Sequence, residues 1–242
     1  MMSGIWDIID NYWKAYLWTD GYKFSGLLIT LWLLALSVFF GFLLSIPLSV
    51  ARVSSNKWVS KPVWLYTYIF RGTPLYVQLL LIYSGLYSLE MVKNTEALNT
   101  FFRDGFNCTI VAFVLNTCAY TTEIFAGAIK ATPYGEIEAA RAYGMSRFTA
   151  YRRIILPSAL RRALPAYSNE VIFMLHSTPI AFTATVPDLL KVARDANAAT
   201  YKSFEAFGLA ALVYLCVTFT LVWMFRKAEN RWLSYLQPRK SH

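Results

Sequence analysis

Five long apolar stretches dominate this 242-residue chain. They lie near residues 24–51, 63–89, 107–130, 157–180 and 206–226. Each has about 20 residues or more, which is the length that an α-helix needs to cross the hydrocarbon core of a bilayer. The alternation of apolar and polar residues that a membrane β-barrel requires is absent. The sequence therefore predicts an all-α integral membrane protein with five transmembrane helices.

The composition agrees with a protein that lipid surrounds. Hydrophobic residues make up 57% of the chain and charged residues only 15%, whereas soluble domains have about a quarter of charged residues. The three cysteines, Cys108, Cys118 and Cys216, lie in or beside apolar stretches and have no CxxC spacing. This pattern predicts small buried side chains and neither a disulfide framework nor a metal site.

The distribution of charge predicts the orientation. Most of the 23 Lys and Arg residues lie in the loops 52–61 and 130–162 and in the tail from Arg226. Most of the 14 acidic residues lie in segment 1–23 and in the two loops on the opposite side. Because cytoplasmic loops are rich in Lys and Arg, the N-terminus is expected outside and the C-terminus inside. The net charge of +9 therefore indicates topology and not a nucleic-acid partner.

One cytoplasmic loop, at 132–156, has an unusual pattern. Glu136 and Glu138 are expected in the first turn of a short helix, where acids suit the helix dipole. Alanines give that helix a slim face, and Gly144 permits a sharp turn before a second, amphipathic segment. Composition alone also fits a helix that lies on the lipid headgroups.

The spacing of this loop distinguishes the two interpretations. The pattern E-A-A-x(3)-G-x(9)-I-x-L-P, from Glu138 to Pro157, is similar to the loop by which membrane subunits of ABC importers dock onto their ATPase. The segments at 70–79, 120–129 and 157–170 resemble those of permeases for polar amino acids. The chain is identified as a member of this permease family. It resembles most the M-type subunits of systems that import histidine, lysine, arginine and ornithine.

The resemblance implies a fold of the type I importer permease, with membrane domain 24–228, a periplasmic segment 1–23 and a cytoplasmic tail 229–242. It implies a bacterial inner-membrane location, no catalysis and no cofactor. The implied partners are a sister permease subunit in a heterodimer, a cytoplasmic ATPase dimer and a periplasmic binding protein. The implied ATPase-coupling residues are Glu138, Ala139, Ala140, Arg141, Gly144, Ile154, Leu156 and Pro157. One departure from the family is the segment 176–180, which reads H-S-T-P-I where many members have a lysine, a polar residue and Thr-Ser-Leu.

Three charged residues, Arg71, Glu123 and Glu170, fall inside predicted spans. A charge in the membrane costs at least a few kcal/mol, so each requires a partner, water or a function. One hypothesis is that Glu170, together with Asn169 and less strongly Glu123, lines a pathway for cationic amino acids. The alternative is that Arg71 and Glu123 form a structural pair and that Glu170 bonds to the sister subunit.

Other functions remain open at this point. A subunit for glutamine, an ATP-independent carrier or channel, and a purely structural subunit each fit a polytopic chain. Gly21 and Gly26 have the spacing of a phosphate loop, but Leu27 and Leu28 follow them where Lys and Ser or Thr are needed. The energy for transport is therefore expected to come from another chain.

Overall fold

The computed structural model describes residues 2–233, and all regular elements within that range are helical. They are α1 (Met2–Leu17), α2 (Gly26–Arg52), α3 (Lys57–Gly72), α4 (Leu75–Leu80), the π-helical turn η1 (Leu81–Leu86), α5 (Glu90–Asn94), α6 (Glu96–Arg103), α7 (Gly105–Lys130), α8 (Tyr134–Ala142), α9 (Arg147–Ala150), the π-helical turn η2 (Tyr151–Ile155), α10 (Leu156–Ser177), the 3₁₀ turn η3 (Thr178–Ala184), α11 (Leu189–Thr200) and α12 (Ser203–Trp232).

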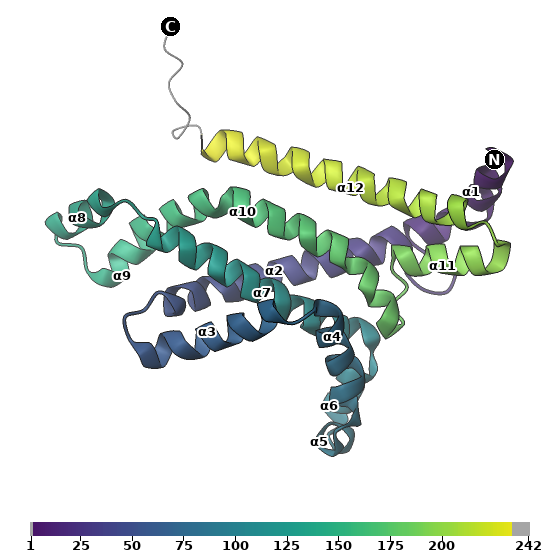
Figure 1. Ribbon diagram of the computed structural model, residues 1–242, viewed down its shortest axis with the longest axis horizontal. Helices are drawn as coiled ribbons and strands as arrows, with labels where there is room; N and C mark the ends of the chain where they lie inside the picture. Colours follow the sequence, from purple (N-terminus) through teal and green to yellow (C-terminus); the bar gives the residue numbers. More distant parts are fainter. Residues whose placement is uncertain (1, 234–242) are drawn as a thin grey trace, which may run out of the picture.

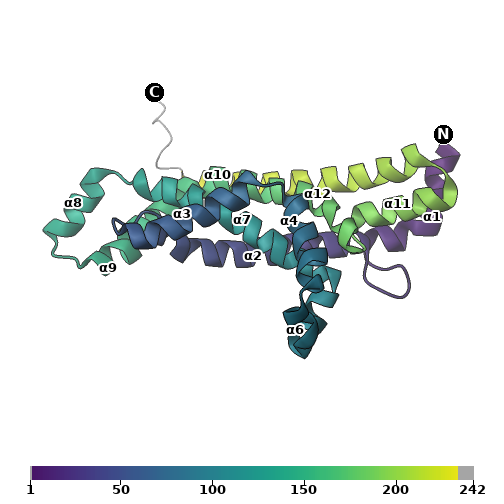
Figure 2. The same ribbon diagram turned by 60° about the horizontal axis from the view of Figure 1, so that its bottom comes forward.

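The long helices α2, α7, α10 and α12 run along the long axis of the molecule (Figure 1). Helices α8 and α9 lie at one end of this bundle, and α1 and α11 lie at the other (Figure 1). Turning the molecule shows that the α5–α6 segment projects to the side of the bundle (Figure 2). Two polar ends thus flank one helical body, as expected of a chain that crosses a bilayer.

Three of the helices, α2, α7 and α12, are long and apolar enough to cross a membrane among the residues described. The predicted spans at 63–89 and 157–180 are helical too, but they contain charges. Helix α10 continues through Pro165 without ending. The predicted tail begins inside α12, and its residues beyond 233 lie outside the described part of the chain.

The second predicted span, at 63–89, is not one continuous helix, because it is fully interrupted at Pro74. Helix α3 ends at Gly72, and Thr73 adopts an extended backbone with φ −117° and ψ 145°. The proline ring disfavours the helical conformation for the residue before it, so α4 begins anew at Leu75. The Gln78 side chain donates from Nε2 to the carbonyl oxygens of Phe70 (2.8 Å) and Thr73 (3.0 Å). This side chain therefore compensates for backbone hydrogen bonds that the interruption removes.

A stripe of small residues joins α2 to α7, which is the principal partner of α2. Ser37, Gly41, Ser45 and Ser49 recur every fourth residue and are all buried. Residues four apart lie on one helix face, and small residues there let two membrane helices approach closely. A Cβ at Gly41 would collide with the methyl group of Thr117 in α7.

We therefore expect Gly41→Ala to destabilise the protein, because filling a tight contact costs about 1–3 kcal/mol. The matched control is Gly127→Ala, since Gly127 lies in a helix of the same bundle and a Cβ there would meet open space. The midpoint of thermal unfolding in detergent should fall for Gly41→Ala and stay or rise for Gly127→Ala. Equal midpoints would contradict the close packing of α2 on α7.

The N-terminal segment predicted at 1–23 contains a packed helix. Ile8 and Tyr16 of α1 are buried against α11 and α12. The Tyr16 hydroxyl donates to the Ala206 carbonyl oxygen at 2.9 Å, and Lys202 pairs with Asp7 at 2.5 Å. Helix α1 thus closes the end of the bundle that is opposite α8 and α9.

Candidate functional site

Glu123 of α7 has an ion partner other than the one considered from the sequence. The Arg52 Nε atom lies 2.6 Å from Glu123 Oε1, and the Thr67 hydroxyl donates to the same oxygen at 2.7 Å. Of the two alternatives left open by the sequence, the Arg71–Glu123 pair is not formed in the described chain, because Arg52 is the ion partner of Glu123. Arg52 ends α2, and because α2 lies along α7 its side chain reaches the carboxylate. The contact ties α2, α3 and α7 together near their ends.

Arg71, at the end of α3, lies beside Tyr120 of α7. The guanidinium carbon is 5.3 Å from the centre of the Tyr120 ring, which is within the range of a cation–π contact. The Tyr120 hydroxyl in turn donates to the Arg71 carbonyl oxygen at 3.3 Å. Tyr120 therefore positions the Arg71 guanidinium, while the carboxylate of Glu123 is paired with Arg52.

A polar cavity of about 520 Å³ opens beside Arg71 at the interruption between α3 and α4. Its walls come from that interruption, from α7 and from α10, and they contain charges of both signs. The lining residues are Arg71, Gly72, Thr73, Pro74, Leu75, Asn116, Tyr120, Glu170, Phe173, Met174 and Ser177. The backbone gap at Pro74 thus provides the space, and two neighbouring helices provide the polar groups.

Glu170 is the acidic residue of this cavity, and it is only 8% exposed. Its Oε1 accepts a hydrogen bond from the Thr117 hydroxyl at 3.0 Å. Among the described residues, no Lys, Arg or His lies within ion-pair distance of it. Because buried carboxylates generally pair with a cation, Glu170 is suited to a cationic ligand.

Sequence reasoning missed two amides, Asn116 in the cavity wall and Gln78, to which it is hydrogen-bonded. The Asn116 side chain donates from Nδ2 to Gln78 Oε1 at 3.1 Å and to the Phe70 carbonyl oxygen at 3.2 Å. Both amides are buried, at 7% and 6% exposure. A polar side chain inside an apolar stretch was the available signal, because burial in a membrane protein requires such groups to have partners. Together they hold the interrupted helix at a fixed distance from α7.

Asn169 lies away from this cavity, although it precedes Glu170 in the sequence. Successive residues of an α-helix are separated by about 100° around its axis, so the two side chains leave α10 in different directions. Asn169 lines a separate cavity of about 380 Å³ between α10 and α12, together with Ser168 and Glu229. The structure therefore divides the predicted group: Arg71 lines one cavity with Glu170 and a second cavity with Glu123, whereas Asn169 lines neither of them.

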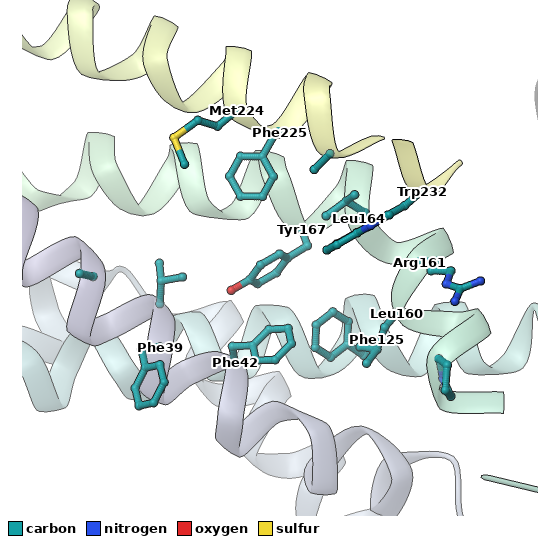
Figure 3. Close-up of a pocket in the computed structure, with 14 residues that line it drawn as sticks. Phe39, Phe42, Phe125, Leu160, Arg161, Leu164, Tyr167, Met224, Phe225 and Trp232 are labelled. Atoms are coloured by element: carbon teal, nitrogen blue, oxygen red, sulfur yellow. The ribbon is translucent and has the colours of Figure 1, made fainter. Parts of the chain in front are cut away.

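A larger cavity of about 930 Å³ lies between α2, α7, α10 and α12. Figure 3 shows the rings of Phe42, Phe125 and Tyr167 in its middle; the Phe42 and Phe125 centroids are 5.5 Å apart. Among its lining residues in the described chain, Arg161 alone is charged. Apolar walls and a single cation make this cavity unsuitable for a cationic polar solute.

The loop at 132–156 forms the predicted arrangement of short helix, turn and short helix. Helix α8 contains the E-A-A residues, and Gly144 follows it with φ +67°, a conformation that favours glycine. Glu138, Ala139 and Arg141 are exposed, whereas Ala140 is 2% exposed and faces inward. Pro157 lies in the first turn of α10, where proline is well tolerated.

Large aromatic side chains surround this exposed face. Tyr134, Tyr143 and Phe148 are 65%, 82% and 74% exposed. Exposed aromatics beside charged residues are typical of protein interfaces. The inner side of α8 packs instead through Ile137 against a small core of Ile129, Ile155 and Ala159. Helix α8 therefore has one face on the bundle and one face available to a partner.

His176, near the other end of α10, lies within hydrogen-bond distance of Thr218. Its Nε2 atom is 3.2 Å from the Thr218 hydroxyl oxygen in α12. The contact joins the end of α10 to α12.

Comparison with known proteins gives consistent results. Residues 37–233 match the family described as binding-protein-dependent transport system inner membrane component. The chain is 66% identical over 236 residues to the histidine/lysine/arginine/ornithine transport system permease protein HisM of Escherichia coli strain K12, covering 98% of this chain and 99% of that one. It is 43% identical over 200 residues to the nopaline transport system permease protein NocM of Agrobacterium fabrum, covering 83% of each. A solved amino acid ABC transporter with histidines has a similar fold, with TM-score 0.74, 34% identity and coverage of 85% of this chain and 92% of that one.

Proposed function

This chain belongs to the family of binding-protein-dependent transport system inner membrane components, and from that premise we propose that it is a permease subunit that carries histidine, lysine, arginine and ornithine into the bacterial cytoplasm. The observation that carries the substrate class is the identity of 66%, over nearly the full length, to a relative named for those four amino acids. As a permease subunit, the chain is not an enzyme, and ATP hydrolysis belongs to a separate subunit.

The proposed topology has five spans, formed by α2, by α3 with α4 and η1, by α7, by α10 and by α12. The two spans that are not apolar throughout both line the polar cavity, together with α7, and such helices need not face lipid. The Lys- and Arg-rich loops lie at the end of the bundle that contains α8 and α9. This supports a cytoplasmic loop 132–156 and tail 229–242, a periplasmic segment 1–23, and a membrane domain over 24–228.

We place substrate passage at the polar cavity. Basic amino acids have a cationic side chain and an α-ammonium group, for which Glu170 offers a buried carboxylate. They also have an α-carboxylate, for which Arg71 offers a guanidinium on the same cavity wall. Two opposite charges in one cavity thus suit a zwitterion with an additional positive charge. Glu123 and Asn169 have supporting roles in the proposal, as parts of the charge network around the pathway.

The cavity also supports a partner subunit. Within the described chain its walls come from the α3–α4 interruption, α7 and α10, and one large residue of these walls, Phe173, is 67% exposed. A sister permease subunit in a heterodimer would cover this side and complete the pathway. The cytoplasmic ATPase dimer would bind the exposed face of α8, and the periplasmic binding protein would deliver the amino acid at the opposite end.

The alternative within this class is transport of another polar amino acid such as glutamine. We propose to test it by labelled arginine uptake in cells that lack their own basic amino-acid import and express this chain with its partners. Excess unlabelled lysine, histidine and ornithine should each reduce the uptake, and excess glutamine should leave it unchanged. Competition by glutamine alone would retain the permease and overturn its proposed substrates.

A further inference from the structure

One arginine near the start of α10 contacts the segments on both sides of the α7–α8 junction. The Arg162 Nη2 atom donates to the Thr132 hydroxyl at 2.9 Å and to the Ala128 carbonyl oxygen at 3.3 Å. Its Nη1 atom donates to the Ser158 hydroxyl at 2.6 Å and lies 3.8 Å from Glu136 Oε1 in α8. A single guanidinium therefore joins the last turn of α7, the linker after it, α10 and the first turn of α8.

The Arg162 guanidinium is held in place by its burial and by its acceptors. The Arg162 and Glu136 side chains are 18% and 36% exposed, and Thr132 is 8% exposed. The Ala128 carbonyl lies in the last turn of α7, where helical carbonyls lack an intrahelical partner and a cation suits the dipole. A guanidinium is planar and presents its donors in a rigid fork, so it holds several acceptors at fixed relative positions.

The contact between Arg162 and Glu136 is the adjustable part of this arrangement. At 3.8 Å it is an ion pair without a hydrogen bond, and its carboxylate is partly exposed. Partly exposed pairs of this kind are weak, so the distance between Arg162 and Glu136 can change at little cost. The contacts of Arg162 with α7, its linker and α10 are shorter than this ion pair and are hydrogen bonds.

We propose that Arg162 is a positioning residue that delivers the movement of the docking loop to the polar cavity. Glu170 follows Arg162 by eight residues in α10, which is about 12 Å along a helix that continues through Pro165. Helix α7, whose end Arg162 holds, contains Asn116 and Thr117, which line the cavity or bond to Glu170. A displacement of α8 changes the position of Glu136 relative to Arg162. Through Arg162 it therefore acts on α7 and α10, the two helices that position the Glu170 carboxylate.

This role rests on the proposed docking of the ATPase at α8, and it differs from docking itself. Glu138 and Arg141 lie on the exposed face of α8, whereas Glu136 faces the bundle through Arg162. Loss of Glu138 should disrupt the partner contact. Loss of Arg162 should leave the contact with the ATPase intact and should weaken the coupling between movement of α8 and the polar cavity.

The test compares Arg162→Gln with Arg161→Gln in proteoliposomes that hold the complete transporter with its ATPase, sister subunit and binding protein. Arg161 is the adjacent residue, it is exposed, and within residues 2–233 it makes no hydrogen bond or ion pair. ATP hydrolysis and arginine uptake are measured on the same vesicles. We expect Arg162→Gln to retain ATP hydrolysis and to lower the uptake per ATP roughly tenfold, as the loss of charge-assisted hydrogen bonds predicts.

Arg162→Lys keeps the charge but not the fork, and it should lie between Arg162→Gln and the wild type; it also decides the outcome if Arg162→Gln does not assemble. Uptake per ATP in the Arg162 variants that equals the value for Arg161→Gln would overturn the proposal. A parallel fall in hydrolysis and uptake would assign Arg162 a structural role only and would overturn it too. Wild-type vesicles without ATP-dependent uptake would instead refute the proposed function.

Discussion

Replacement of Glu138 with arginine is expected to abolish ATP-dependent uptake. Glu138 is exposed on the outer face of α8, next to the large exposed aromatics of the loop. If the ATPase binds here, reversal of the charge places like charges together at the interface. The loss of one partner of a close interfacial charge pair costs about 2–5 kcal/mol, or roughly 30- to several thousand-fold in affinity. Uptake by reconstituted vesicles and co-purification of the ATPase measure this directly.

The control for this variant is Asp10→Arg, which reverses an exposed acid of α1 at the opposite end of the bundle. Co-purification of the ATPase should be preserved there. Glu138→Gln, which removes the charge without reversing it, should have a smaller effect than Glu138→Arg. Full uptake and normal ATPase binding by Glu138→Arg would show that α8 is not the docking helix.

Replacement of Glu170 with glutamine is expected to spare assembly and to slow the uptake of basic amino acids. Glutamine has the same shape and can still accept the hydrogen bond from Thr117, so α10 should remain packed on α7. Only the negative charge that would face a cationic substrate is lost. A hydrogen bond to a charged group contributes about 1.5–3 kcal/mol, which corresponds to roughly a 10- to 100-fold change.

Glu229→Gln is the matched control, because Glu229 is a carboxylate in the neighbouring cavity between α10 and α12 and accepts from Ser168 at 3.3 Å. Initial rates of arginine uptake against concentration should reveal an impaired Glu170→Gln and an unimpaired Glu229→Gln. Unchanged kinetics in Glu170→Gln would exclude Glu170 from the pathway and favour a structural role for its carboxylate.

The helices of the bundle could be predicted from the sequence because length and hydropathy determine which segments can span a bilayer. The segments predicted at 24–51, 107–130 and 206–226 correspond to α2, α7 and α12, with ends that differ by a few residues. The helix–turn–helix geometry of the loop 132–156 was predictable too, since Pro133, Gly144 and Pro157 constrain the backbone locally. Local signals of this kind need no knowledge of distant contacts.

The partners of the buried charges could not be predicted, because they depend on tertiary packing. Depth along a helix places Arg71 and Glu123 at a similar level, but the side chain of Arg52 arrives from α2 and forms the contact. The packing of α2 on α7 depends on a stripe of small residues, whose partner helix the sequence does not identify. Likewise, only the direction in which each side chain leaves α10 separates Asn169 from Glu170.

The most direct test of the account is arginine uptake into proteoliposomes that contain this chain, its sister subunit and its ATPase, with binding protein outside. ATP is either enclosed or replaced by a non-hydrolysable analogue. The account predicts uptake that requires hydrolysable ATP and that fails when this chain bears Glu138→Arg. Uptake that proceeds equally without ATP hydrolysis would show that the chain is an ATP-independent carrier, and would contradict the central claim.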